Sequence, residues 1–384
     1  MKILMIAPEP FFEPRGTPFS EYFRIKALSH LGHDIDLVTY PIGEDKEIKN
    51  LKIYRSFRPF FIKSVKTGPS FNKLILDFFL FFKVIPRLMK NKYDLIHTHE
   101  EANIMGVFFS KIMRIPHLYD MHSSLVQQMD NFQFTKSKFI KWIFKKIENT
   151  TLKNAKSIIV ICKSLFDHAK KLTDEGKLTI IENFYDEIDY NNLDENKLNK
   201  IKNEMNPDNK KLIVYTGTLE HYQGIPLLID SMEYLDDDFL LVLIGGKEEQ
   251  VERLKKEVLE RGLEDKVKLL GTKSYEVMPY YLRIADVLVS PRSKGTNIPL
   301  KIYSYLKSGK PVVATNLYTH TQSIDNKIAI LVNPEPKDFA GGIKKAVSDE
   351  GIIISENALR FSNKNYSFEN YLRLVDIAIK KAIN

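Results

Sequence analysis

The stretch IADVLVSPRSKGTNIPLKIYSYLKSGKPVVAT, residues 284–315, carries a strand, a loop, a helix and a second strand in succession. The runs DVLVS and KPVVAT are short and apolar, which is typical of buried strands. Between them, Pro299 favours the first turn of a helix, and Gly309 suits its end because glycine accepts the left-handed conformation there. Two buried strands joined through a helix form the repeating unit of a parallel α/β sheet.

The same alternation of strands and helices fills the rest of the chain, in two series separated by a stretch rich in Asn, Asp, Glu and Lys. We therefore expect an α/β protein with two Rossmann-like, doubly wound domains facing each other across a cleft. The expected boundaries are residues 1–185 for the first domain, 186–210 for the linker, 211–365 for the second domain and 366–384 for a terminal helix.

Composition limits the class of protein. Of the 384 residues, 43% are hydrophobic and 28% are charged, which indicates a globular protein. The net charge of +8 favours anionic partners: phosphorylated molecules, nucleic acid or an anionic membrane. The single cysteine, Cys162, fits a reducing compartment. We find no secretory signal and no apolar run of the ~20 residues that span a bilayer, so we expect a cytoplasmic protein.

The loop before Pro299 is rich in cations. Arg292 and Lys294 precede Gly295, Thr296 or Asn297 is placed to cap the helix, and Lys301 lies on the first turn. Free backbone N–H groups at a helix start bind anions, so the sequence predicts a diphosphate site here. The alternative is an ordinary loop whose cations are solvated.

Two groups of polar residues follow predicted strands in the first domain. The segment HLYDMHSS places Asp120 and His122 at a strand end, and IHTHEEAN places His97 and His99 on one strand face before Glu100. His122 is either structural or functional, and we favour function. We considered zinc at the two other histidines, but no cysteine or further histidine lies at a suitable spacing, so we expect no metal.

Several of these motifs resemble glycosyltransferase family four, whose members are retaining sugar transferases of the GT-B fold. The resemblance rests on residues 284–315, on PRGTPFSEYFRIKALSHLGHDIDLVTYP and on YTGTLEHYQGIPLLIDSM, and it covers nearly the whole chain. It implies transfer of a sugar from a nucleotide diphosphate with retention at the anomeric carbon, without metal or cofactor. It also implies an acceptor-side first domain, a donor-binding second domain and a terminal helix that crosses back to the first.

Four positions depart from the family pattern. The family carries two glutamates eight positions apart before a G-x-P-V-V segment, and these fall here on Thr296 and Ser304. Its phosphate-binding Arg and Lys fall on Thr218 and Gln223. Neutral side chains cannot supply the same charge-assisted bonds, so we expect the cations of residues 291–301 to contact the diphosphate instead.

The resemblance assigns roles to residues in the loops that follow strands. The predicted catalytic residues are His122, Asp120 and Lys301. The predicted donor-binding residues are Gly16, Thr17, Gly217, Thr218, Gln223, Arg292, Lys294, Gly295, Thr296, Asn297 and Ser304. The predicted acceptor-binding residues are Arg15, His99 and Glu100.

Residues 55–92 hold nine Lys or Arg and one acid, Asp77, with phenylalanines interleaved. A second basic patch surrounds Trp142 and comprises Lys136, Lys138, Lys141, Lys145 and Lys146. This composition favours peripheral attachment to an anionic membrane, on the inner face of the cell membrane. The alternative is that residues 74–85 form a core helix with solvated lysines.

The sequence therefore predicts a retaining glycosyltransferase that uses a nucleotide-sugar donor and a lipid-linked or cell-envelope glycan acceptor. The alternative is a non-catalytic GT-B protein that binds nucleotide sugar or glycan as a scaffold or regulator. We expect no nucleic acid partner, because no recognisable nucleic-acid motif accompanies the positive charge.

Overall fold

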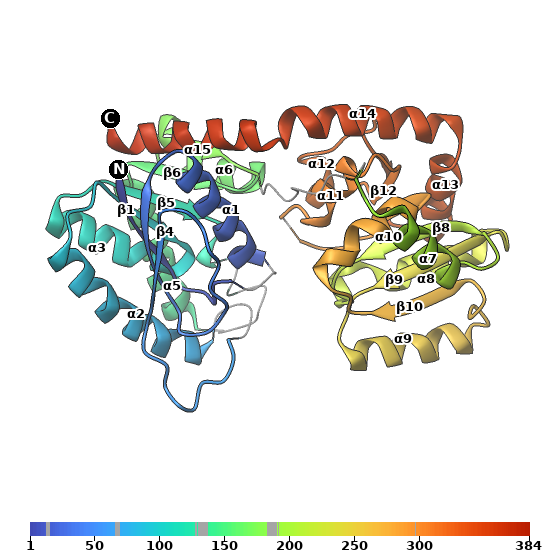
Figure 1. Ribbon diagram of the computed structural model, residues 1–384, viewed down its shortest axis with the longest axis horizontal. Helices are drawn as coiled ribbons and strands as arrows, with labels where there is room; N and C mark the ends of the chain where they lie inside the picture. Colours follow the sequence, from blue (N-terminus) through green and yellow to red (C-terminus); the bar gives the residue numbers. More distant parts are fainter. Residues whose placement is uncertain are drawn as a thin grey trace. The chain divides into compact units, whose positions relative to one another are not determined.

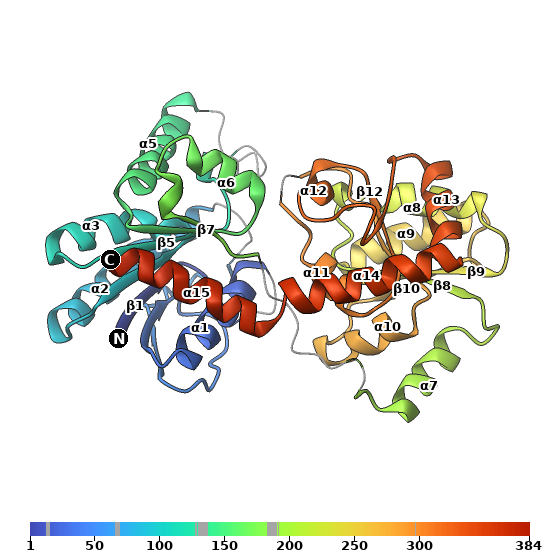
Figure 2. The ribbon, with the colours of Figure 1, turned by 90° about the horizontal axis from the view of Figure 1, so that it is seen from above.

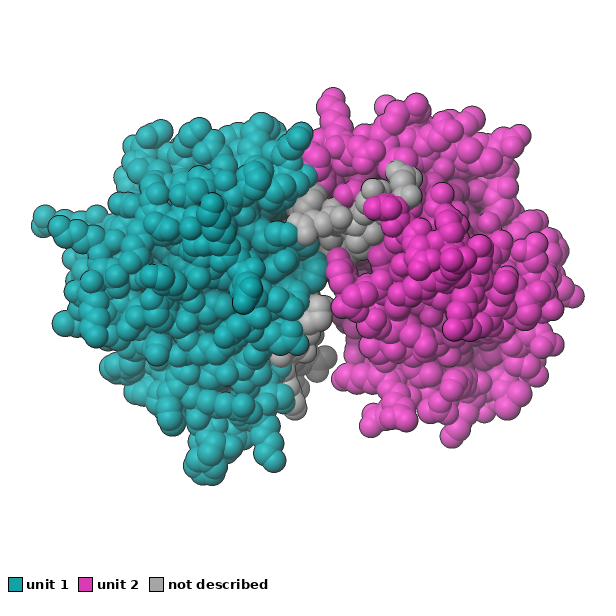
Figure 3. Space-filling view, viewed as in Figure 1, with its two compact units in different colours: residues 1–184, 368–384 teal, residues 185–367 magenta. Residues whose placement is uncertain are grey.

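The computed structural model (Figure 1) describes residues 1–12, 16–65, 70–126, 129, 137–182, 190, 192–295 and 297–384. The chain forms two compact units, which Figure 3 shows in different colours. Unit 1 comprises Met1–Phe184 and Phe368–Asn384, and unit 2 comprises Tyr185–Ser367. The chain thus leaves unit 1, builds unit 2 and returns to unit 1 with its last helix.

Unit 1 is built on a seven-stranded sheet in the order β3-β2-β1-β4-β5-β6-β7, and all its strand pairs are parallel. Its central strands are buried along nearly their whole length, as expected for a sheet covered on both faces. The strands are β1 (Lys2–Ala7), β2 (Asp34–Thr39), β3 (Leu51–Arg55), β4 (Leu95–His99), β5 (His117–Met121), β6 (Ser157–Val160) and β7 (Leu178–Ile180).

Helices cover both faces of this sheet (Figures 1 and 2). On one face α2 packs on β2 and β3, and α3 packs on β4, β5 and α5; on the other, α15 packs on α1, β5, β6 and β7. The helices of unit 1 are α1 (Gly16–His30), α2 (Phe71–Lys90), α3 (Asn103–Met113), α5 (Lys138–Asn154), α6 (Lys163–Lys170) and α15 (Phe368–Ile383), with short 3-10 turns η1 (Glu100–Ala102) and η2 (Glu175–Lys177).

Helix α2 shows how the sequence selects its core face. It begins after Ser70, whose side chain accepts a hydrogen bond from the backbone N–H of Lys73. Its buried residues recur every fourth position and therefore form one stripe against the sheet, as expected for a helix on a sheet. The stripe comprises Leu76, Leu80, Val84 and Leu88. The alternative interpretation, that residues 74–85 form a core helix, is thus correct for this inner stripe.

Unit 2 repeats the architecture with a six-stranded parallel sheet in the order β10-β9-β8-β11-β12-β13. Residues of α8, α9 and α13 share one apolar core with this sheet. The strands are β8 (Lys211–Thr216), β9 (Phe239–Ile244), β10 (Val267–Gly271), β11 (Val287–Ser290), β12 (Val312–Thr315) and β13 (Ile330–Val332).

The helices of unit 2 connect these strands, and α14 packs against α11. They are α7 (Glu195–Met205), α8 (Ile225–Ser231), α9 (Glu248–Glu260), α10 (Met278–Ile284), α11 (Lys301–Lys307), α12 (Tyr318–Thr321), α13 (Pro336–Ala346) and α14 (Asp349–Asn365), with 3-10 turns η3 (His221–Gln223), η4 (Met232–Tyr234) and η5 (Tyr275–Val277).

Helix α7 lies within residues 186–210, the segment predicted as a linker. Asp194 caps this helix, because its side chain accepts from the backbone N–H groups of Asn196 and Lys197. The helix packs against α10. The predicted linker therefore contains a helix with a capped start, although its composition is polar. Residues 186–189 and 191 lie outside the described part of the chain.

Two adjacent glycines in α13 provide a test of this packing. An added Cβ at Gly341 meets nothing within 4 Å, whereas one at Gly342 lies 2.7 Å from Val332 Cγ1 and 3.0 Å from Val313 Cγ1. We expect Gly341→Ala to stabilise unit 2 by about 0.5–1 kcal/mol through helix propensity. We expect Gly342→Ala to destabilise it by about 1–3 kcal/mol through overpacking. Urea unfolding of both variants measures the two signs, and effects of equal sign contradict the packing of α13.

Candidate active site

The order of the strands places a candidate site in each unit. In an open parallel sheet, ligands bind outside the carboxyl ends of the strands where the strand order reverses. That position lies between β1 and β4 in unit 1 and between β8 and β11 in unit 2. The loops that follow these four strands and their neighbours, β5 and β12, are therefore the segments to inspect.

A buried ion pair lies at this edge of unit 1. The Nε of Arg24, from α1, donates to Asp120 Oδ2 at the end of β5 over 2.7 Å, and both side chains are inaccessible to solvent. The guanidinium also lies 5.2 Å from the ring centroid of Tyr371, from α15. Burial alone raises the pKa of Asp120, but the charge of Arg24 and hydrogen bonds from His122 and His97 hold it well below its usual value.

Three histidines surround the same carboxylate. His122 Nε2 lies 3.3 Å from Asp120 Oδ1 and 3.3 Å from His99 Nδ1, and His97 Nε2 lies 3.5 Å from Asp120 Oδ2. The His97 and His99 rings stack at 4.8 Å, and the His99 and His122 rings at 5.5 Å. Burial lowers the pKa of His97 and His99, so these two rings are neutral at pH 7. Asp120 is thus placed to orient His122.

The ligand atoms of His97, His99 and Asp120 lie within 4.8 Å of one another, a spacing that also suits a metal ion. The Arg24 guanidinium, however, already neutralises Asp120 and contacts it directly. A metal cation bound to the same carboxylate faces repulsion from this buried charge. We therefore interpret the group as an ion-pair and histidine network, and we assign no metal to it.

Glu100 follows β4 at the same edge, in a left-handed conformation with φ of 44°. Its carboxylate accepts from Ser123 Oγ at 3.0 Å and from Thr17 Oγ1 at 3.5 Å. Burial, followed by the charge of Glu101, raises the pKa of Glu100 to about 7. The predicted residues Thr17, His99, Glu100, Asp120 and His122 are thus all at one edge of unit 1.

Two further acids are buried near this edge, Glu9 after β1 and Glu21 in α1. The charges of Glu21 and Glu100 both act on Glu9. Burial raises the pKa of both well above its usual value. We did not predict them, nor Arg24. Each is a charged residue within or beside an apolar segment, which is the signal that marks a buried functional or structural charge.

Glu148 of α5 holds the loop that follows His122. Its carboxylate accepts from the backbone N–H of Leu125 at 2.7 Å and from Ser124 Oγ at 3.2 Å, and it contacts His168 Nε2 at 2.7 Å. The side chain of Glu148 is 1% exposed. A buried, multiply bonded carboxylate fixes the start of the loop, and therefore also the strand end that carries His122.

A buried cation marks the corresponding edge of unit 2. Lys301 Nζ, from α11, lies 3.5 Å from the ring centroid of Tyr215 and has no hydrogen-bond partner among the described residues. A Cβ at Gly217, which has φ of 132°, would lie 2.9 Å from this Nζ, so glycine leaves room for the ammonium. Burial, followed by the charge of Arg292, lowers the pKa of Lys301 well below its usual value.

Other predicted polar residues gather around the end of β8. Tyr215 Oη donates to the carbonyl of Thr218, and Gln223 Nε2 donates to Thr218 Oγ1 at 3.4 Å. In the described part of the chain, Gln223 Oε1 and Ser304 Oγ are buried without a hydrogen-bond partner. Ser304 lies one turn after Lys301 on α11, on the same helix face. Unit 2 therefore offers a buried cation with unused hydrogen-bonding groups nearby.

The loop after β11 supplies a second cation. Arg292 lies 5.3 Å from the Tyr222 ring centroid, and its Nε donates to the carbonyl of Lys294 at 2.8 Å. Gly295 has φ of 121°, and a Cβ there would lie 2.4 Å from Arg292 Nη2, so this close turn requires glycine. The Lys294 side chain is exposed.

The predicted start of the following helix is wrong. Helix α11 begins at Lys301 with Leu300 at its N-cap position and no side-chain cap. Pro299 precedes the helix, and its carbonyl accepts from the backbone N–H of Ile302. Asn297 contributes its carbonyl to Thr319 Oγ1 at 2.8 Å. A 3-10 turn thus replaces the expected cap, so the charge at this site comes from side chains.

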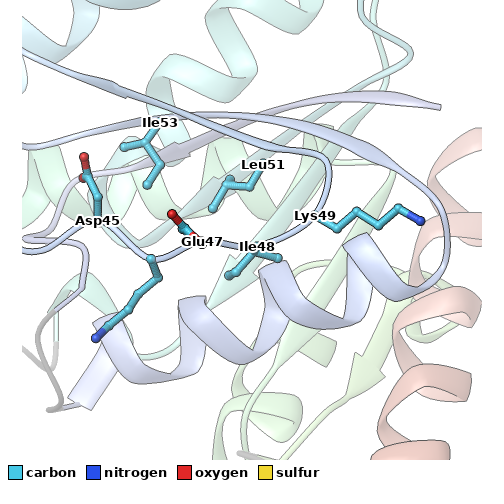
Figure 4. A pocket seen from close by; sticks show the side chains of 7 residues that line it. Asp45, Glu47, Ile48, Lys49, Leu51 and Ile53 are labelled. Atoms are coloured by element: carbon cyan, nitrogen blue, oxygen red, sulfur yellow. The ribbon is translucent and has the colours of Figure 1, made fainter.

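Three residues named in the sequence analysis have no described position in the structure. Arg15, Thr296 and Lys136 lie outside the described residues, and Gly16 is the first residue of α1. A pocket of about 490 Å³ on unit 1, shown in Figure 4, contains none of the predicted site residues. It is lined by residues 45–49, Leu51 and Ile53, whose charged side chains are largely solvated.

The buried Arg24–Asp120 pair predicts a large effect of one substitution. We expect Asp120→Asn to lower the free energy of unfolding by about 3–5 kcal/mol at pH 7, because it leaves Arg24 buried without a counter-charge. Since folding lowers the pKa of Asp120, its contribution is complete above its unfolded pKa of about 3.9 and is lost as pH falls through the folded value. The difference in the free energy of unfolding between the wild type and Asp120→Asn should therefore become smaller at acidic pH.

Asp45→Asn is the matched control, because Asp45 also pairs with an arginine, Arg55, but is 73% exposed. We expect it to cost less than about 1 kcal/mol. Denaturant unfolding at pH 7 and at acidic pH measures both variants. Equal costs for the two aspartates at pH 7 refute the structural role of the buried pair.

Sequence profiles of two families match the chain. Residues 24–187 match "Glycosyltransferase Family 4", and residues 196–368 match "Glycosyl transferases group 1". An uncharacterized glycosyltransferase of Methanocaldococcus jannaschii, MJ1607, is 26% identical over 96% of this chain and 95% of its own. A Campylobacter jejuni N,N'-diacetylbacillosaminyl-diphospho-undecaprenol alpha-1,3-N-acetylgalactosaminyltransferase is 22% identical over 80% of this chain and 82% of its own.

Solved structures share the fold. Anabaena HepE in complex with UDP has a TM-score of 0.77 with 17% identity, over 99% of this chain and 100% of its own. WaaG, a glycosyltransferase involved in lipopolysaccharide biosynthesis, has a TM-score of 0.70 with 14% identity, over 97% of this chain and 99% of its own. The predicted fold, two Rossmann-like α/β domains of the GT-B type, is confirmed by these likenesses.

Proposed function

We propose that this chain, which belongs to the family 4 glycosyltransferases, transfers a sugar from a nucleotide diphosphate to a lipid-linked or cell-envelope glycan with retention at the anomeric carbon. The observation that carries the proposal is Lys301, a buried cation without a hydrogen-bond partner in the described chain. An unpaired buried charge is costly, and a bound diphosphate is the counter-charge that such a site lacks.

The donor diphosphate binds to unit 2 in this proposal. Lys301 and Arg292 contact its oxygens, and Gly217 allows the phosphate to approach β8 closely. Preorganised cations stabilise the charge that develops on the leaving diphosphate, so the reaction needs no metal. The Anabaena HepE structures contain UDP and, in one case, UDP-glucose, which supports this class of donor.

The substituted positions have specific consequences for the donor. Ser304 Oγ and Gln223 Oε1 are buried without a hydrogen-bond partner among the described residues, and we assign them to hydrogen bonds with the nucleotide sugar. Neither can form a charged, bidentate bond to a pair of hydroxyls, as a glutamate does. The pocket thus has a neutral group at Ser304, where the family has a glutamate, and another at Gln223, where the family has a lysine. Its preference among donors follows from these neutral contacts.

The polar edge of unit 1 acts on the reacting sugar and the acceptor in this proposal. Asp120 orients His122 toward the donor sugar, while His99 and Glu100 contact acceptor hydroxyls. Glu100 has a pKa of about 7, so it either accepts or donates a hydrogen bond near neutral pH. The Campylobacter relative acts on a diphospho-undecaprenol substrate, which supports a lipid-linked acceptor.

Binding of UDP tests the donor site directly. We expect Lys301→Met to weaken UDP binding by about 10- to 100-fold, as expected for the loss of one charge-assisted bond. Its free energy of unfolding should be unchanged or higher by up to about 2 kcal/mol, because a buried unpaired group is removed. Calorimetry and urea unfolding measure the two quantities. GDP and ADP are tested in parallel, because the sequence does not identify the base.

Lys310→Met is the matched control for this variant. Burial also lowers the pKa of Lys310, but this residue precedes β12 and so lies at the opposite, amino end of the sheet. In the wild type, burial lowers the pKa of Lys301 and a bound diphosphate favours its charged form. Above this lowered pKa, binding therefore takes up a proton and weakens as pH rises further. Equal loss of binding in both variants refutes the assignment of Lys301.

Turnover tests the role of unit 1. We expect His122→Ala to retain UDP binding but to release nucleoside diphosphate from the donor about 100-fold more slowly, as expected for the loss of one positioned polar group. His33→Ala, which lies before the amino end of β2, serves as the control. Full donor turnover in His122→Ala refutes the proposed role of this residue.

The alternative function, a non-catalytic protein that binds nucleotide sugar, is favoured by the four departures at Thr218, Gln223, Thr296 and Ser304. The same assays separate the two functions. Donor binding without measurable turnover in the wild type, with any acceptor offered, establishes the alternative.

A further inference from the structure

Helix α2 of unit 1 carries a second apolar stripe in addition to the one in the core. Its members follow each other at spacings of three, four, four and seven residues, so they lie along one side of the helix. They are Phe71, Leu74, Phe78, Phe82 and Met89, with exposed fractions between 49% and 80%. A helix that only covers a sheet does not require this outward stripe. An exposed apolar stripe of this kind indicates a surface that contacts another molecule.

The neighbouring helices α3 and α5 also carry exposed apolar residues. On α3, Ile104, Phe108 and Ile112 are exposed at four-residue spacing, and Phe81 of α2 contacts Phe108 at 5.7 Å. Helix α3 in turn packs on α5, where the exposed rings of Phe139 and Trp142 stack at 6.1 Å. The exposed residues of α2, α3 and α5 named here form what we call the outer apolar face.

The charges around this face are one-sided. The two carboxylates in the three helices both point inward: Asp77 accepts from Tyr40 Oη at 2.6 Å, and Glu148 accepts from the backbone N–H of Leu125. The exposed cations of the same helices are Lys90, Lys111, Lys138, Lys145, Lys146 and Lys153. An outward surface that combines aromatic side chains with cations and no exposed carboxylate is complementary to an anionic lipid surface.

We propose that the outer apolar face docks unit 1 on an anionic bilayer. None of the helices described in this chain is both long enough and apolar enough to cross a membrane, so α2, α3 and α5 lie in the plane of the interface. The aromatic rings enter the headgroup region and the lysines contact lipid phosphates. A second copy of this chain is a poorer occupant, because a two-fold contact places like charges against each other.

This inference does not depend on the proposed catalytic function. It predicts the same docking for an enzyme and for a non-catalytic binding protein, because it rests on α2, α3 and α5 alone. Where the acceptor is lipid-linked, the docked surface keeps unit 1 near the layer that holds it.

The experiment uses Trp142, the only tryptophan in the sequence, as a built-in reporter. Its fluorescence is followed while the full-length protein is titrated with phosphatidylcholine vesicles or with an equimolar mixture of phosphatidylcholine and phosphatidylglycerol. We expect a blue shift and cosedimentation with the anionic vesicles, weakened by high salt, and little response to the neutral ones.

Two double variants form a matched pair. Phe78→Ser with Phe82→Ser removes side chains of the outer apolar face that are 59% and 53% exposed. Ile352→Ser with Ile353→Ser removes residues of α14 in unit 2 that are 54% and 58% exposed. We expect the first pair to weaken vesicle binding at least tenfold and the second to leave it unchanged, while both retain wild-type unfolding.

Three results overturn the proposal. The first is the absence of both a spectral shift and cosedimentation with anionic vesicles. The second is equal vesicle binding by the two double variants. The third is a Trp142 shift that depends on protein concentration without vesicles, together with dimers in sedimentation analysis, which assigns the face to a second copy.

Discussion

A buried guanidinium bonded to a buried carboxylate holds the functional edge of unit 1 together. Arg24 comes from α1, Asp120 from β5, and Tyr371 of the last helix covers the pair from the other end of the sequence. Such a pair is stable only when both charges are present and well bonded. Because His97 and His122 contact the same carboxylate, their positions depend on this pair, and so does the chemistry proposed for them.

The two units differ in whether a buried charge has a counter-charge. In unit 1 the charges of Arg24 and Asp120 compensate each other, and the site keeps its geometry without a ligand. In unit 2 the Lys301 ammonium has an aromatic ring beside it but no counter-charge in the described chain. A compensated site suits a rigid set of polar groups, whereas an uncompensated one gains most when an anion arrives. The contrast matches the proposed division, in which unit 1 acts on a neutral sugar and unit 2 holds a charged diphosphate.

The sequence alone predicted the parallel sheets, because each strand is a short apolar run followed by a helix with recognisable ends. It also placed His99, Glu100, Asp120 and His122 at or just after strand ends, and the structure brings them to one edge because β4 and β5 are neighbours. It did not predict Arg24, because an arginine in a helix pattern has no visible partner until a carboxylate 96 positions away folds against it. The start of α11 was misplaced for a local reason: a 3-10 turn at Pro299 satisfies the backbone without the expected cap.

The return of α15 to unit 1 has a consequence for biosynthesis. All residues of unit 2 lie between Phe184 and Phe368, so the ribosome completes unit 2 before it makes the helix that covers β5, β6 and β7. During translation one face of the first sheet therefore lacks its last layer, and Arg24 lacks the ring of Tyr371. The nascent first unit stays incomplete until residues 368–384 emerge, so it closes only after the whole of unit 2 has been made, not at the end of its own contiguous sequence.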